Sequence, residues 1–232
     1  MGAQKVLVEG SSVTASQMQD FFRQTADGSI NGRLFQMFLD HQLKFDLEKV
    51  VVDWGQVYKT LGMQTEYKAW QNVPTVVEDP ICWDVHVVQG VIPNRVITAF
   101  RELGVKVETY VADLDGNVPT NDRDPKNGSY CARFKKTIEA DPELANKSAN
   151  DLAEEKIPGI TLLERLLLEL GYFLATGEHL DIENVTLCTG SRCSGGLVPS
   201  VHWDAGHRAL YVDWYDPDNR HPNLRARAAV NA

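Results

Sequence analysis

Two cysteines near the C-terminus are the residues whose type and spacing could most directly do chemistry. Cys188 and Cys193 stand close together in the sequence, and a thiol acts as a nucleophile or redox centre where its surroundings stabilise the thiolate. The other two cysteines, Cys82 and Cys131, complete no regular framework. Such cysteines are usually free and buried in a reducing compartment. The sequence leaves both interpretations of the pair open.

A set of histidines and aspartates follows the cysteines and could in principle ligate a metal ion. The set consists of His202, Asp204, His207 and Asp213. On a strand His202 and Asp204 would share one face, but His207 lies beyond a turn at Gly206. Because a metal site demands defined geometry, we favour surface side chains and expect no metal and no cofactor.

A polar loop at residues 113–127 invites a calcium interpretation, because carboxylate-rich loops bind hard cations. It carries two pairs of carboxylates, Asp113 with Asp115 and Asp122 with Asp124. The loop lacks the twelve-residue EF-hand pattern and its closing Glu. We favour a solvated loop, and calcium binding stays open.

The composition of the C-terminal tail differs from that of the rest of the chain. The 49 residues from Asn184 onward contain no Lys, Glu, Gln or Met, although these four types supply 39 of the first 183 residues. Short strands and turns disfavour some of these types, which is one explanation. A constraint on the codons of the tail is the other.

The run YDPDNRHPNLRARAAV (Tyr215 to Val230) resembles the ending of C-type-lectin-fold variable proteins of diversity-generating retroelements. That family closes with an Asn/Pro/Arg-rich loop and a last strand, here Leu224 to Arg227. Adenine-specific mutagenesis randomises chosen codons in the family, usually AAC or AAT, and codons ending in C or T cannot encode Lys, Glu, Gln, Met or Trp. The missing residue types match what this resemblance implies.

The resemblance implies a binding surface, because Tyr, His, Asp, Asn and Ser on neighbouring loops give amphipathic contacts and adaptable hydrogen bonds. Trp203, Trp214 and Arg225 are expected to be scaffold, with both Trp side chains pointing inward. The expected variable, ligand-contacting residues are Cys193, Ser200, His202, Asp204, Asp213, Tyr215, Asp216, Asp218, His221 and Asn223.

Two other functions compete with diversified binding. Formylglycine-generating enzymes share the C-type lectin fold and place two reactive cysteines four residues apart near their C-terminal strands. Here about 36 residues separate Cys188 from the strand at Leu224, and the surrounding Arg/Tyr pattern is missing. A structural or assembly protein with a constant partner is the third possibility. We expect non-covalent recognition rather than an enzyme.

The bulk composition narrows the classes of partner that we expect the protein to bind. The net charge of −9 argues against nucleic acid, because a nucleic-acid-binding protein shows a basic face. No membrane span and no Sec-type signal is visible. We expect an unknown macromolecular ligand, most plausibly a protein, and cytoplasmic location by default.

The elements that must position these residues follow from periodicity and capping signals. The whole chain, including the segments QDFFRQTADGSI and GITLLERLLLELGYFLATGEHLD, also resembles proteins of uncultivated bacteria without assigned function. Strands are expected at 50–52, 83–90, 105–111 and 129–134, helices at 16–24, 29–41, 54–61, 93–103, 148–155 and 161–176, and a helical turn at 135–141.

The order of these elements along the chain is compatible with the C-type lectin fold, and the resemblance of the tail implies that the closing strand pairs with the first. We therefore expect an α+β protein with a C-type lectin fold in its formylglycine-generating-enzyme-like variant. Residues 1–72 would form a helical N-terminal segment. Residues 73–232 would form the ligand-binding domain, with a variable region at 188–232.

Overall fold

Helix α8 lies at the centre of the described residues, which are 50–70 and 81–230 of a computed structural model. It spans Leu162–Thr176 and nearly all its residues up to Tyr172 are buried. The predicted capping box forms between Thr161 and Glu164, and Gly177 ends the helix in the left-handed conformation. Each buried Leu of this helix stabilises the fold by about 1.5–3 kcal/mol.

The other helices are short. The predicted helices at 16–24 and 29–41 lie outside the described residues. Those described are α3 (Trp54–Thr60), α4 (Gln64–Trp70), α5 (Pro93–Glu102), α6 (Leu114–Asn117) and α7 (Ala149–Glu154), with 3₁₀ turns η2 (Pro125–Asn127) and η3 (Pro142–Leu144).

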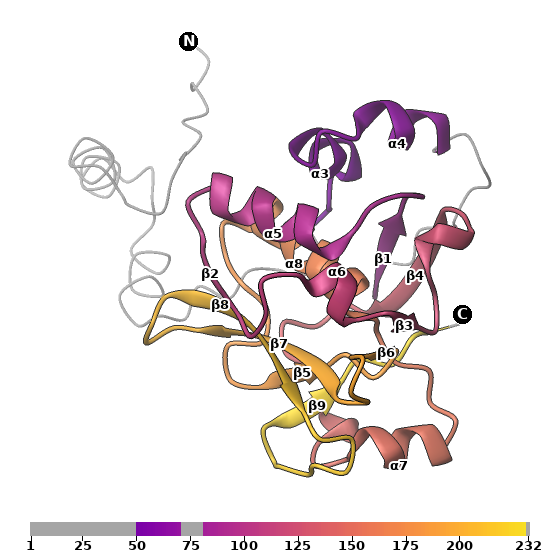
Figure 1. The fold of residues 1–232 in the computed structure, drawn as a ribbon. Coiled ribbons are helices and arrows are strands. Elements are labelled where there is room, and N and C mark those ends of the chain that lie inside the picture. The colour runs from indigo at the N-terminus through magenta and orange to yellow at the C-terminus, as the bar shows by residue number, and fades with distance from the viewer. Residues whose placement is uncertain (1–49, 71–80, 231–232) are drawn as a thin grey trace, which may run out of the picture. The chain divides into compact units, whose positions relative to one another are not determined.

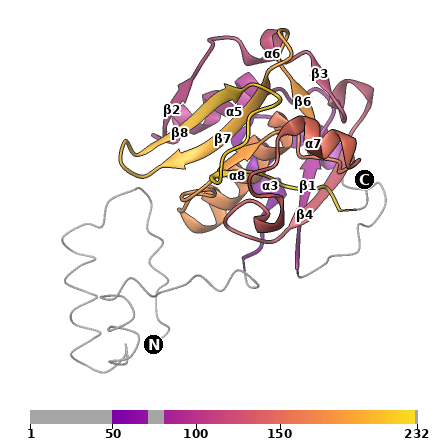
Figure 2. The same cartoon turned by 90° about the horizontal axis from the view of Figure 1, so that it is seen from below.

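The main sheet has five strands in the order β2-β8-β7-β5-β9. Its strands are β2 (Lys106–Thr109), β5 (Val185–Leu187), β7 (Val198–Asp204), β8 (Ala209–Tyr215) and β9 (Leu224–Ala226). Strand β7 is antiparallel to both β8 and β5, whereas β2 and β9 run parallel to their neighbours. Figures 1 and 2 show α5 and α8 together on one side of this sheet.

Two small sheets complete the fold. Strand β1 (Cys82–Val87) pairs with β4 (Tyr130–Lys135), and β3 (Thr120–Asn121) pairs with β6 (Ser191–Arg192), both antiparallel. The predicted α+β class is confirmed. The expected pairing of the first and last strands is wrong, because β9 adds to the edge of β5 and β1 is occupied by β4.

Two local predictions are wrong as well. Residues 50–52 form no strand, and residues 135–141 form no helical turn. The second segment stays open because the carbonyl oxygens of Thr137 and Ile138 accept hydrogen bonds from Arg227. A helical turn would draw such carbonyls into its own hydrogen bonds.

Helix α3 belongs to the same core as the sheet. Its Val57 and Tyr58 are fully buried in one cluster with the leucines of α8. The expected domain boundary at residue 72 falls within 71–80, outside the described residues, so it stays a prediction.

A network of buried charges joins α8 to the last strand. Arg165 donates to Glu169 and Asp181, and Arg227 donates to Asp181 at 2.8 Å. Burial alone would raise the pKa of Asp181, but the guanidinium groups of Arg227 and Arg165 hold it below its ordinary value. His179 contacts Glu169 at 2.8 Å and extends the network to the sheet.

An aromatic cluster surrounds His86 of β1. Its ring stacks on Trp54 with centroids 5.2 Å apart, and its Nδ1 lies 3.2 Å from the hydroxyl of Tyr67. Burial lowers the pKa of His86 to about 4. An unfolded His takes up its proton near pH 6.5.

The stability of the protein should therefore fall as the pH drops from about 6.5 to 4, because the unfolded state binds the His86 proton first. In His86→Gln this part of the fall should be missing, as measured by urea unfolding at several pH values. His221→Gln, which changes an exposed His, should keep the wild-type dependence. An unchanged profile in His86→Gln would contradict the prediction.

Candidate functional site

Strands β7 and β8 form a hairpin with one side turned away from α8. Val201, Leu210 and Val212 point into the core that α8 fills. Because side chains alternate along a strand, the intervening residues point the other way. We call this outward set the hairpin face; it consists of Ser200, His202 and Asp204 of β7 and Tyr211, Asp213 and Tyr215 of β8.

The register of the hairpin brings these residues together. Ser200 lies opposite Asp213, and His202 lies opposite Tyr211. Opposite residues in an antiparallel pair have neighbouring side chains. Five of the ten expected contacts, drawn from both strands, therefore share one side of the hairpin.

Tyr211 is a member of this face that the sequence analysis did not select. Its ring stacks on His202 with centroids 5.4 Å apart, and His207 approaches its edge at 6.2 Å. Tyr211 is half-buried and occupies the middle of β8. Strict alternation from Asp213 and Tyr215 would have selected it.

Two residues that were expected to contact a ligand, Ser200 and Cys193, are buried instead. Ser200 lies on the hairpin face but is fully covered, and its hydroxyl has no hydrogen-bond partner among the described residues. Cys193 is 6% exposed, and its Sγ lies 2.9 Å from the hydroxyl of Tyr110. Neither side chain is accessible to a macromolecular ligand in this structure.

The two tryptophans take different positions. Trp203 packs against the core and stacks on His179, with centroids 3.5 Å apart. Trp214 lies on the same side of β8 as Val212 but is 43% exposed, so it extends past the core and is not buried in it as expected. It sits near the end of β8, where its ring and that of Tyr110 are arranged edge to face with centroids 6.3 Å apart. Trp214 therefore adds an exposed aromatic surface near the end of the hairpin.

The loop after β8 holds the remaining expected contacts, Asp216, Asp218, His221 and Asn223, all exposed. The loop is tied to α7, since Asn150 donates to Asp218 at 2.6 Å and Arg220 pairs with Asp151. Arg225 lies half-buried in β9 and donates to the carbonyl of Ala140 at 3.4 Å. Figure 1 shows α7 beside this end of the sheet.

Two ionisable groups of the hairpin face, Asp204 and His202, have shifted pKa values. The side chain and N–H of His207 bond to Asp204 and lower its pKa to about 2. Burial lowers the pKa of His202, whose Nδ1 has no hydrogen-bond partner within residues 50–70 and 81–230. At neutral pH the face thus presents the charged carboxylate of Asp204 beside the uncharged imidazole of His202.

The cysteine pair is poorly placed for chemistry. Cys188 is fully buried and Cys193 nearly so. Burial raises the pKa of both thiols, which disfavours the reactive thiolate.

Both thiols should therefore react slowly in the folded protein. In a Cys82→Ser, Cys131→Ser variant, reaction with dithionitrobenzoate at pH 7.5 should be at least about tenfold slower than in the urea-unfolded chain. Rapid reaction of one thiol in the folded protein would contradict this and revive the enzyme alternative.

The carboxylates of loop 113–127 have structural partners. Asp113 accepts from the N–H of Gly116 and from Asn94, and Asp124 accepts from the N–H of Lys126. Within the described residues, no group of three or more His, Cys, Asp or Glu could hold a metal ion.

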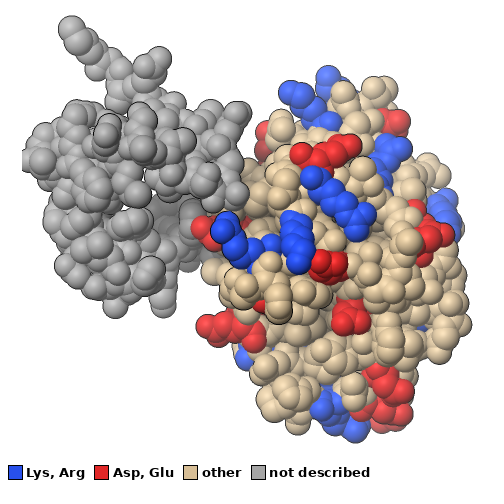
Figure 3. Space-filling model, turned by 60° about the vertical axis from the view of Figure 1, so that its left-hand side comes forward, with Lys and Arg blue, Asp and Glu red and all other residues tan. Residues whose placement is uncertain are grey.

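The surface charges and the length of the helices bear on the partners expected from the sequence. On the described residues of the side drawn in Figure 3, acidic and basic side chains are interspersed. None of the helices within 50–70 and 81–230 combines the length and apolar character needed to cross a bilayer.

No protein-family model, curated protein or solved structure matches the chain. What the chain does is therefore inferred from its residues, their geometry and the resemblance of its tail.

Proposed function

We propose that this chain is a non-covalent ligand-binding protein whose hairpin face and adjoining loop recognise a macromolecule, most plausibly a protein. We further propose that it is a variable protein of a diversity-generating retroelement on a C-type lectin scaffold. One observation carries the proposal, the shared outward orientation of expected contacts on neighbouring strands: His202, Asp204 and Asp213.

The way the hairpin is built supports substitution at these positions. Main-chain hydrogen bonds hold β7 to β8, and they do not depend on which side chains point outward. The inward residues Val201, Leu210 and Val212 carry the packing against α8. The outward residues His202, Asp204 and Asp213 can thus change identity while the backbone stays in place, which is what a diversified binding surface requires.

The genomic neighbourhood tests the proposal. A reverse transcriptase gene and a near-copy of the coding tail, differing only where the copy carries adenine, would support it. Differences should fall on outward codons such as those of His202, Tyr211 and Asp213, and spare the inward codons of Val201 and Val212. A neighbourhood without the repeat, or differences spread equally over both sets, would refute diversification.

A further inference from the structure

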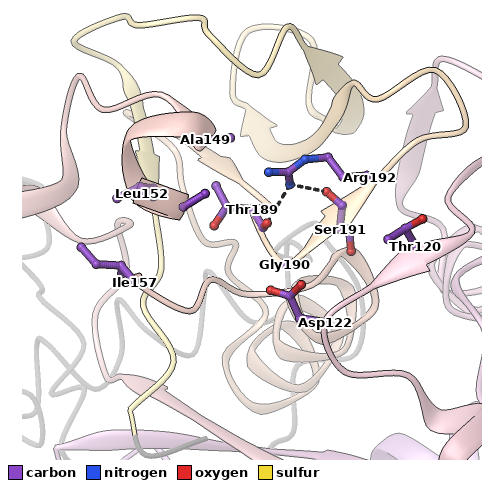
Figure 4. A pocket seen from close by; sticks show the side chains of 10 residues that line it. Thr120, Asp122, Ala149, Leu152, Ile157, Thr189, Gly190, Ser191 and Arg192 are labelled. Carbon is purple, nitrogen blue, oxygen red and sulfur yellow. Dashed lines mark hydrogen bonds between the residues drawn. The ribbon is translucent and has the colours of Figure 1, made fainter. Parts of the chain in front are cut away.

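A pocket of about 250 Å³ lies between α7 and the segment that enters β6 (Figure 4). It shares no residue with the hairpin face, so a function here is independent of the one proposed above. Its lining comes from three parts of the chain: Thr120 and Asp122; Ala149, Leu152, Ala153 and Ile157; and Thr189 to Arg192.

The walls of the pocket differ in chemistry. Leu152, Ala153 and Ile157 form an apolar wall from α7 and the turn after it. The opposite wall is polar and carries Asp122 and Arg192. Figure 4 shows the Asp122 carboxylate and the Arg192 guanidinium on opposite sides of Gly190.

The two charged groups lack charged partners. Arg192 Nη1 donates to the carbonyls of Thr189 and Ser191 at 2.7 and 2.8 Å, which holds the guanidinium in place. Within residues 50–70 and 81–230, no carboxylate forms an ion pair with Arg192, and no cation forms one with Asp122. A positive and a negative group thus face one pocket without neutralising each other.

The polar wall is held rigidly by the surrounding backbone. The N–H of Asp122 donates to the carbonyl of Gly190 at 2.8 Å, and the N–H of Gly190 donates to Ile160 at 3.0 Å. The hydroxyl of Ser191 donates to Asn121 and accepts from the N–H of Leu162. Such preorganisation lowers the entropic cost of binding.

We propose that this pocket binds a free α-amino acid with a small aliphatic side chain. The carboxylate would pair with Arg192, whose guanidinium suits bidentate binding, and the ammonium group would pair with Asp122. The aliphatic side chain would contact Leu152 and Ile157. The volume lies just below the usual range for drug-sized ligands, about 300–1,000 Å³, which fits a single amino acid.

Titration of the full chain with L-valine, followed by ¹H–¹⁵N NMR, tests the proposal. We expect saturable shifts at the amides of residues 149–153 and 189–192, with a dissociation constant of about 1 mM or lower. Isovalerate, which lacks the ammonium group, and isobutylamine, which lacks the carboxylate, should each bind at least about tenfold more weakly, the usual loss for a charge-assisted hydrogen bond.

Single substitutions test the roles of Asp122 and Arg192 separately. Asp122→Asn should abolish the preference for valine over isovalerate, and Arg192→Gln should abolish the preference over isobutylamine. Ala153→Leu, at an exposed wall position, should block binding without changing either charge. Arg101→Gln, an exposed Arg on α5, should bind like the wild type.

Several outcomes would overturn the proposal. The first is that valine, alanine and glycine all fail to bind saturably. The second is equal affinity for valine and its two analogues. The third is that the amide shifts are confined to residues other than 149–153 and 189–192. Because Asp122→Asn and Ala153→Leu leave the carbonyl contacts of Arg192 intact, they stay informative even if Arg192→Gln does not fold.

Discussion

Arg227→Met should lower the free energy of unfolding by about 3–5 kcal/mol, the usual cost of removing one partner from a buried ion pair. The Arg227 side chain is buried, and it bonds to Asp181 and to the carbonyls of Thr137 and Ile138. Met has similar volume but no donors, so these acceptors lose a partner in the interior. Urea unfolding followed by circular dichroism measures the change.

Arg220→Met is the matched control in the same tail. Arg220 pairs with Asp151, but it is exposed, with 52% of its side chain accessible. Exposed pairs contribute only about 0–1 kcal/mol, so this variant should stay close to the wild type. Equal losses in the two variants would show that the buried network does not stabilise the fold as described.

Gly190→Ala should lower the free energy of unfolding by about 1–3 kcal/mol or more, the usual cost of overpacking a core. A Cβ at this position would lie 2.6 Å from the carbonyl oxygen of Gly159 and 3.1 Å from Thr161. The clash is with backbone rather than with a flexible side chain, so the segment that enters β6 must shift. Thermal and urea unfolding both report the loss.

Gly195→Ala is the comparison for this substitution. Apart from Gly195 and its two chain neighbours, no heavy atom of the described residues lies within 4 Å of a Cβ at this position, and its φ is not positive. The substitution should therefore be neutral or slightly stabilising, because Ala reduces the freedom of the unfolded chain. If Gly190→Ala were equally harmless, the close approach at Gly159 would be wrong.

Residue types and spacing determined most of the local structure. The capping box of Thr161 with Glu164, the Gly177 stop and the leucine run predict α8, because each signal acts within a few residues along the chain. Pro93 and Ser148 mark the starts of α5 and α7 in the same way. These signals depend on local backbone geometry and need no tertiary contact.

Strand pairing required the tertiary structure. Nothing within Leu224 to Ala226 specifies β5 as its partner rather than β1, because a short strand can add to many sheet edges. Residues 135–141 likewise form no helical turn because groups distant in sequence, Arg227 among them, donate hydrogen bonds to the carbonyls of Thr137 and Ile138. Non-local hydrogen bonds decided both cases.

The hairpin face was predictable in part. Period-two alternation places His202 with Asp204, and Asp213 with Tyr215, on common sides of their strands. Which side faces solvent, and that Ser200 is covered while Trp214 is exposed, depend on α8 filling the core and on where that core ends. The sequence determined the alternation, and packing against α8 determined which half of it a ligand can reach.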